Sequence, residues 1–173
     1  MKKKIVLIAL LAGLGFSNAN SQTVPDALNK LFRMEGNWQA PSTFVLDGNT
    51  FNFTYYANFT KNAEGSGMYM EENFSLPGLG DLKGYNLIGF NARDEKIHWF
   101  TVDNFGTTHE HIGYWVTDDH FFMSVTEKHD GKKFEELIDL VFIDNDHVSI
   151  HMIGKLANTT FQELTGTFER MPN

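Results

Sequence analysis

The sequence contains no cysteine. This excludes disulfides, thiolate ligands for metals and a cysteine nucleophile, and it removes the residue that anchors bacterial lipoproteins. The fold must therefore be stabilised by its packed core. The chain has neither a Gly-x-Ser-x-Gly elbow nor a P-loop, so the sequence carries no signature of these two kinds of catalytic site.

Positive charge is scarce. The chain has 14 lysines and arginines against 22 aspartates and glutamates, and its formal net charge is -8. Nucleic acids and anionic membrane surfaces both favour basic proteins. We therefore expect neither of them as a partner.

Long apolar runs are also missing, except at the N-terminus. A positive segment at residues 2–4 precedes an apolar run at 5–16, which is followed by small residues. The run is too short to span a bilayer and is typical of a secretory signal peptide. Cleavage after Ser21 would give a leader of residues 1–21, and cleavage after Ala19 fits equally well.

Removal of the leader leaves residues 22–173, the usual size of a single domain with one core. No later apolar run is long enough to cross a membrane. Secreted eukaryotic domains of this size often depend on disulfides, and this chain has none. We therefore expect a bacterial periplasmic or secreted protein.

The remaining chain begins with a short helix pattern over residues 24–32. Pro25 suits the first turn of a helix, and Leu28, Leu31 and Phe32 share one apolar face. A helix of this length is marginal on its own, so it should dock on an apolar surface. The open end of a barrel would provide one.

From Trp38 onward the apolar period changes to two, and turn residues recur about every 8–12 positions. The short turns favour antiparallel neighbours, and no helical period interrupts them. The pattern predicts an all-β protein: an antiparallel up-and-down barrel of about 8–10 strands with a short N-terminal helix. A Greek-key sandwich, which needs a long return connection, is the alternative. The expected strands are residues 37–46, 50–60, 66–74, 83–91, 96–103, 107–116, 121–128, 133–143, 147–155 and 159–170.

A Gly-x-Trp segment, Gly36 to Trp38, opens this run of strands, and Arg170 lies on the last one. The arrangement resembles the calycin superfamily of lipocalins and fatty-acid-binding proteins. The resemblance implies that Arg170 lies across the ring of Trp38 at the barrel floor, in a cation–π contact worth about 0.5–2 kcal/mol. It gives Gly36, Trp38 and Arg170 structural roles rather than ligand contacts.

Within this superfamily the chain is similar to secreted bacterial barrels of the domain of unknown function 1579 group. The similar features are residues 103–106 between two strands and Gly113 in the next strand. The segment that follows Gly-x-Trp in the haem-binding nitrobindin barrels does not occur here, so haem is not expected. The sequence leaves the cofactor unknown.

The histidines are the most suggestive side chains. His109 and His111 lie two apart on one expected strand, so both leave the same face. This spacing is typical of zinc sites that take a third ligand from a neighbouring strand, and His98 could supply it. His151 or Glu136 could do so from across the barrel. The alternative is a row of hydrogen-bonded histidines on a wet face.

Aromatic residues are abundant, with 16 Phe, 5 Tyr and 3 Trp. A barrel of this size either fills with side chains or holds one small ligand. Walls that mix Tyr, Trp and His suit a planar or amphipathic ligand with a few polar groups. The alternation does not settle which strand faces point inward, so the candidate ligand-binding residues come from both: Tyr55, Tyr69, Tyr85, His98, Trp99, His109, His111, Tyr114 and Trp115.

Three functions are compatible with these features. The first is an exported lipocalin-like protein that binds a small hydrophobic or amphipathic molecule, with residues 76–81 as a lid. The second is a metal-assisted or acid–base enzyme that uses His109 and His111 in the same barrel, although no catalytic residue is selected. The third is a filled, ligand-free barrel that serves as an interaction domain. The oligomeric state is not indicated.

Overall fold

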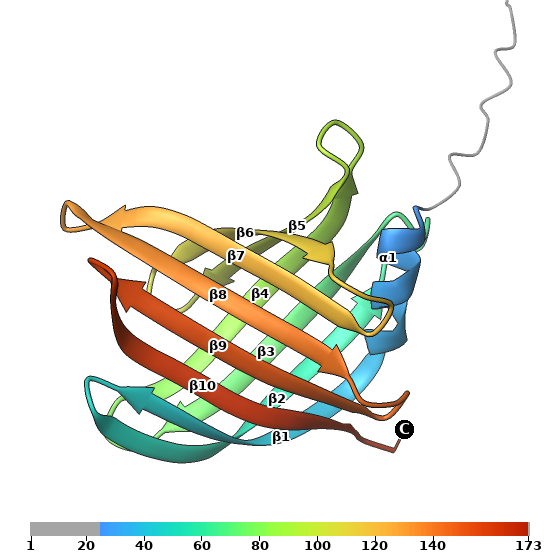
Figure 1. Ribbon diagram of the computed structural model, residues 1–173. Coiled ribbons are helices and arrows are strands. Elements are labelled where there is room, and N and C mark those ends of the chain that lie inside the picture. Colours follow the sequence, from blue (N-terminus) through green and yellow to red (C-terminus); the bar gives the residue numbers. More distant parts are fainter. Residues whose placement is uncertain (1–24, 173) are drawn as a thin grey trace, which may run out of the picture.

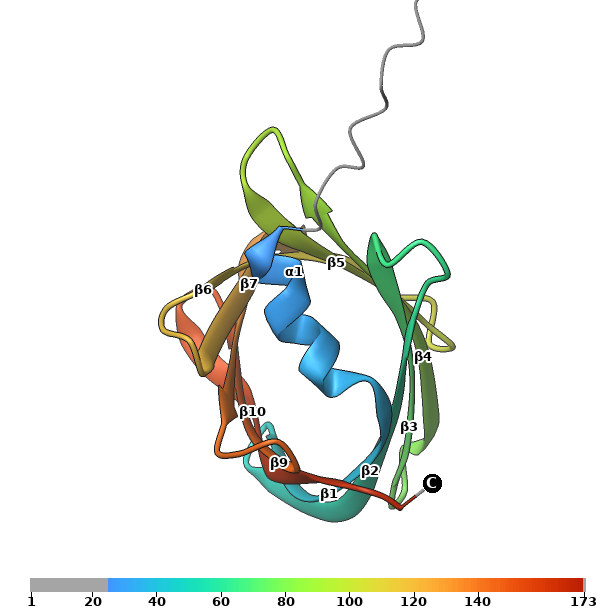
Figure 2. The same ribbon diagram turned by 90° about the vertical axis from the view of Figure 1, so that its right-hand side faces the viewer.

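The computed structural model describes residues 25–172. The expected leader and both of its cleavage sites lie outside the described residues. The described chain forms a closed barrel of antiparallel strands with a short helix across one end (Figure 1; Figure 2). Each strand pairs with its neighbours in sequence, and β1 pairs with β10 to close the barrel. The predicted up-and-down barrel is thus confirmed, and the Greek-key alternative is wrong.

All the predicted strands are present, and their ends differ from the prediction by three residues or fewer. The prediction succeeded because turn residues mark nearly every strand boundary. The strands are β1 (Gly36–Leu46), β2 (Asn49–Lys61), β3 (Gly67–Leu76), β4 (Gly80–Asn91), β5 (Lys96–Asp103), β6 (Thr108–Trp115), β7 (His120–His129), β8 (Lys132–Phe142), β9 (His147–Leu156) and β10 (Thr159–Arg170).

The expected loop at residues 76–81 is instead a tight hairpin turn. Strands β3 and β4 extend toward each other until Leu76 pairs with Gly80. Leu79, at the tip of the turn, is 49% exposed. The expectation that this segment folds over an opening as a lid is therefore wrong, because residues 76, 80 and 81 belong to the two strands and only residues 77–79 form the turn.

The N-terminal helix closes one end of the barrel. Helix α1 (Asp26–Leu31) continues into a 3-10 turn, η1 (Phe32–Met34), and contacts β4 and β5. Figure 2 shows the helix lying across the barrel end. Leu28, Leu31 and Met34 are each 1% exposed, so the apolar face of this short helix is buried against the core, as expected. None of the helices in the described residues is long and apolar enough to cross a membrane.

The same end is fixed by the first and last strands. Trp38 and Arg170 are direct partners across β1 and β10, and the Trp38 indole N–H donates to the carbonyl of Met34 at 2.7 Å. Gly36 adopts a φ of 118°, a backbone conformation that favours glycine. Trp38 and Arg170 thus lie next to each other where the first and last strands meet, at the end of the barrel that the helix covers.

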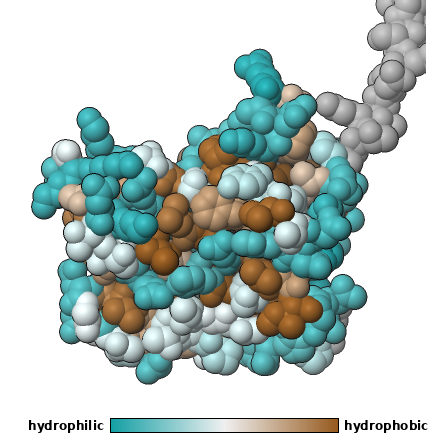
Figure 3. Space-filling model, in the orientation of Figure 1, coloured by the Kyte–Doolittle hydropathy of each residue, from teal (hydrophilic) through white to brown (hydrophobic). Residues whose placement is uncertain are grey.

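Side chains alternate between the barrel interior and its outer surface. On β4, Asn86 and Ile88 point inward, whereas Tyr85 and Leu87 are more than half exposed. The outer surface mixes apolar with polar side chains, as the face in Figure 3 shows. This outer apolar surface is why hydrophobic alternation alone could not identify the interior face.

Candidate functional site

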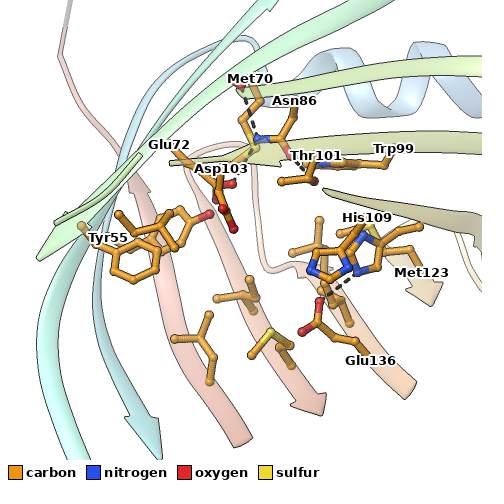
Figure 4. A pocket seen from close by; sticks show the side chains of 18 of the residues that line it. Tyr55, Met70, Glu72, Asn86, Trp99, Thr101, Asp103, His109, Met123 and Glu136 are labelled. Atoms are coloured by element: carbon orange, nitrogen blue, oxygen red, sulfur yellow. Dashed lines mark hydrogen bonds and ion pairs between the residues drawn. The ribbon is translucent and has the colours of Figure 1, made fainter. Parts of the chain in front are cut away.

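The barrel interior is hollow. A cavity of about 280 Å³ lies inside it (Figure 4), and Met34 of the helical cap is one of the residues that line it. Its apolar wall is formed by Met34, Phe44, Phe53, Phe59, Met70, Phe74, Leu82, Trp99, Met123, Ile138, Leu140, Ile150, Met152, Leu164 and Phe168. Its polar lining is formed by Tyr55, Glu72, Asn86, Thr101, Asp103, His109, His111, Glu136 and Gln162.

Asn86 organises one side of the cavity. Its side-chain oxygen accepts hydrogen bonds from the Trp99 indole N–H at 2.9 Å and from the Thr101 hydroxyl at 2.5 Å. Its amide N–H groups therefore face the other way and donate to Glu72 Oε1 at 3.2 Å and to the carbonyl of Met70 at 3.4 Å. The amide orientation is fixed by these bonds, so Asn86 presents a donor to the Glu72 carboxyl group.

Glu72 is an acid enclosed within the barrel. Its side chain lies across the facing residue Gly84, where an added Cβ would stand 2.3 Å from Glu72 Oε1. The pKa of Glu72 is raised to about 7, mainly by burial and also by the nearby carboxylates of Asp103 and Glu136, while the Asn86 hydrogen bond and His111 oppose the shift. Glu72 therefore changes its charge near neutral pH.

A second polar group lies on the opposite side of the cavity. Glu136 is 8% exposed and lies 2.9 Å from His111 Nε2, while Gln162 donates to its other oxygen at 2.7 Å. Gly154 makes room for Gln162, because a Cβ there would stand 2.2 Å from Gln162 Cγ. An ionised carboxylate only accepts, so His111 Nε2 carries the shared proton. His111 Nδ1 is buried and has no hydrogen-bond partner among the described residues.

His109 lies beside His111, with 5.9 Å between the ring centroids. Its Nδ1 is 3.0 Å from Glu127 Oε1, but the contact lacks hydrogen-bond geometry, and this nitrogen too has no hydrogen-bond partner in the described chain. Glu127 is instead hydrogen-bonded to His129, 2.6 Å away, whose ring stacks on Phe134 at 4.5 Å. This cluster lies toward the barrel end that the helix does not cover.

Asp103 adds a third carboxylate to the lining, at the end of β5. Its Oδ1 accepts backbone N–H groups from Phe105 and Thr107, both at 2.9 Å. These bonds fix the turn between β5 and β6 and hold the Asp103 side chain at the cavity wall.

Four of the nine predicted ligand-binding residues line the cavity. They are Tyr55, Trp99, His109 and His111, and they come from β2, β5 and β6. Tyr55 is 7% exposed and stacks with Phe74, at a centroid distance of 5.1 Å. The structure thus brings both members of the His-x-His pair to the interior.

Five predicted residues lie elsewhere. Tyr69, Tyr85 and Tyr114 are 52%, 60% and 48% exposed on the outer face. Trp115 packs under the helix, and its indole N–H donates to the carbonyl of Ala27 at 2.7 Å. The prediction that these four residues line the cavity was wrong. The three tyrosines lie on the outward faces of their strands, and the Trp115 side chain is instead in contact with the helix. The fifth residue is His98.

His98 also points outward. It lies 2.7 Å from Glu110 and 2.9 Å from Asp94, and the hydrogen bond that its ring donates to Glu110 is the main reason that its pKa is raised. On the outer face it cannot join His109 and His111 around one ion, so its expected role as a third zinc ligand was wrong. Among the described residues, no group of three or more His, Asp or Glu side chains is arranged to hold a metal.

The sequence prediction missed several polar residues of the interior, and it named Glu136 only as a possible metal ligand. Glu72 lies between Met70 and Phe74 on one face of β3, and Glu136 lies between Phe134 and Ile138 on one face of β8. An acid at an apolar position of an alternating strand is the signal that could have identified both. The other missed residues are Asn86, Thr101, Asp103 and Gln162, which no such pattern marks.

No protein family model matches the sequence, and no curated protein matches it. Among solved structures, the S-type phycobiliprotein lyase CPES from Guillardia theta is similar, with a TM-score of 0.57 and 14% identity, covering 91% of this chain and 98% of that one. EF1p2_mFAP2b bound to DFHBI has a TM-score of 0.47 and 12% identity, covering 84% and 99%. A redesigned β-barrel, b11L5F_LGL, has a TM-score of 0.43 and 14% identity, covering 84% and 96%.

At these identities the likeness concerns the fold alone. The match to the phycobiliprotein lyase covers 91% of this chain and agrees with the closed antiparallel barrel described above. The narrower expectation, membership of the domain of unknown function 1579 group, has no matching family model and stays a prediction.

Proposed function

We propose that this protein is an exported lipocalin-like barrel that binds one small, apolar or amphipathic molecule in its interior. The observation that carries the proposal is the cavity of about 280 Å³, whose wall is apolar and whose few polar groups converge on one space. Ligand pockets typically measure about 300–1,000 Å³, so the ligand is compact. A ligand-free barrel would instead be filled by its side chains.

The polar lining supports the same reading. Protein interiors are normally close-packed, and buried polar atoms normally have partners. Here the interior is hollow and His111 Nδ1 has no partner among the described residues. Each unpaired buried polar group destabilises the fold by about 1–3 kcal/mol. A bound ligand would fill the space and supply the missing hydrogen bond.

Binding can be measured with N-phenyl-1-naphthylamine, an uncharged probe that fluoresces in apolar sites. We expect saturable binding of one probe molecule. Ile138 lines the cavity, whereas Val141 on the same strand is 37% exposed. Ile138→Phe should weaken probe binding by about tenfold or more through loss of space, and Val141→Phe should leave it unchanged. An absence of saturable binding to the wild type would rule out the proposal.

A second candidate function is acid–base catalysis in the same cavity. It is favoured by the pair of His111 and Glu136 at 2.9 Å, because a histidine oriented by a carboxylate can act as a general base. Across the cavity Glu72, with a pKa of about 7, could act as a general acid. Mass spectrometry of ligand before and after incubation, with wild-type protein and with His111→Gln, tests it. If the ligand is unchanged after incubation with either protein, catalysis is ruled out and binding remains as the function.

A further inference from the structure

The cavity collects acidic side chains, but its lining in the described residues includes no lysine or arginine. Glu72, Asp103 and Glu136 all line it. Burying a carboxylate is strongly unfavourable unless a cation or several donors compensate it. The three acids therefore differ in how well the protein itself satisfies them.

Two of the acids are well satisfied. Asp103 accepts two backbone N–H groups on one oxygen, and both oxygens of Glu136 have partners, His111 and Gln162. Glu72 accepts an amide hydrogen bond from Asn86, which is a neutral donor. Glu72 is thus the acid whose charge most needs a partner from outside the protein.

An independent feature points to the same missing partner. His111 is 4% exposed, its ring lines the cavity, and its Nδ1 has no hydrogen-bond partner among the described residues. When the ring is neutral and its proton is on Nε2, facing Glu136, Nδ1 is a hydrogen-bond acceptor. Glu72 and His111 Nδ1 therefore both require an N–H or O–H donor from a ligand.

The rest of the wall suits a cation with an apolar body. Tyr55, Phe59 and Trp99 line the cavity, and aromatic faces attract organic cations. The methionine and aliphatic side chains offer no hydrogen-bond donor. The site therefore combines acceptors on two facing walls with apolar and aromatic surface around them, as Figure 4 shows for Glu72, Trp99 and Glu136.

We propose that the ligand is an organic ammonium, a small amine with an apolar body, whose N–H groups pair with Glu72 and with His111 Nδ1. This inference rests on the proposed function, since it names the chemical class of the molecule held in the same cavity. An alcohol could donate a hydrogen bond but would leave the charge of Glu72 unpaired. A carboxylate ligand would add a like charge and be repelled.

Three nearly isosteric compounds separate these cases: protonated 3-phenylpropylamine, 3-phenylpropan-1-ol and 3-phenylpropanoate. Each competes with N-phenyl-1-naphthylamine at about pH 8, where Glu72 is ionised. The ammonium should bind about tenfold more tightly than the alcohol, and the carboxylate most weakly. An alcohol or carboxylate that binds as well as the ammonium, or an ammonium that fails to displace the probe, overturns this inference and leaves the proposed function intact. A probe that does not bind overturns the proposed function itself.

A matched pair of variants tests the role of Glu72. Glu72→Gln keeps an oxygen to accept the Asn86 hydrogen bond and removes only the charge. It should weaken ammonium binding by about tenfold and change alcohol binding by less than about twofold. Glu71→Gln is the control, because the neighbouring Glu71 is exposed on the outer face of β3. Equal effects of both variants, or none from Glu72→Gln, would contradict the inference.

Discussion

The guanidinium carbon of Arg170 lies 4.2 Å from the centroid of the Trp38 ring, and the two residues are paired across the strands that close the barrel. The Arg170 N–H groups also donate to the carbonyls of Arg33, Glu35 and Asn145. One side chain therefore joins the end of the helical cap, the first strand, the last strand and the β8–β9 turn. This contact fixes the helix-covered end, opposite the cluster of His109, His129 and Phe134.

Replacing Trp38 with alanine should strongly destabilise the fold. Trp38 is 1% exposed, so the change removes a fully buried aromatic ring and should lower the free energy of unfolding by about 3–5 kcal/mol. Urea unfolding measures this. Phe105→Ala serves as the control, since Phe105 is 56% exposed and should change stability by less than about 0.5 kcal/mol. A loss below about 1 kcal/mol at Trp38 would contradict its role in barrel closure.

Gly113 should not tolerate a side chain. A Cβ at this position would stand 2.3 Å from Phe121 Cζ and 3.0 Å from Met123 Cβ, and Phe121 is fully buried. Gly113→Ala should therefore destabilise the protein by about 1–3 kcal/mol through overpacking. At Gly89 an added Cβ meets nothing within 4 Å, so Gly89→Ala should be neutral or slightly stabilising. Thermal unfolding of the two variants measures the difference. A similar loss of stability in both would show that overpacking against Phe121 is not the cause.

The sequence predicted the local features of the fold better than the features that depend on distant residues. Strand boundaries are local, because turn residues such as those at 47–49 and 130–131 force the chain to reverse. Barrel closure is not local: the meander pattern predicted a barrel, and only the resemblance supplied the contact between Trp38 and Arg170. The inward face was undetermined because both faces of β4 carry large apolar side chains, such as Tyr85 outside and Ile88 inside.

The hydrogen bonds among the polar side chains of the cavity depend on the register in which neighbouring strands pair. Asn86 reaches Glu72 because β3 and β4 pair Glu72 with Gly84 and Met70 with Asn86. Gln162 reaches Glu136 because both flank Gly154 across β9. A shift of one residue in either pairing would send these side chains to the outer face. Such pairings are set by the whole barrel, so no local pattern in the sequence could reveal them.

Export is a separate prediction, because the leader lies outside the described residues. A positive segment, an apolar run and small residues near position 20 favour cleavage by a signal peptidase. Expressed with its full sequence in a bacterium, the protein should accumulate in the periplasm or the medium with Gln22 or Asn20 as its first residue. Mass spectrometry of the intact mature chain measures this, and a chain that keeps residues 1–19 would contradict export by cleavage.

Glu72 should also make stability depend on pH. Its pKa rises from 4.5 to about 7 on folding, so the folded protein holds this proton more tightly than the unfolded chain does. The contribution to stability is fully present below about pH 4.5 and is lost as the pH rises through about 7, by on the order of 3 kcal/mol. Asp103, Glu136 and His111 face Glu72 and influence its titration, so the effect must be isolated by comparison with a variant.

Glu72→Gln cannot titrate, so its stability relative to wild type should increase between about pH 4.5 and 8. Urea unfolding of both proteins across this range gives the difference, and Glu71→Gln, on the outer face, should show no such trend. A constant difference would mean that the carboxyl group is not enclosed. A variant that is more stable at high pH and yet binds ammonium more weakly would show that Glu72 is kept for its ligand, since a purely structural residue would lose stability when replaced.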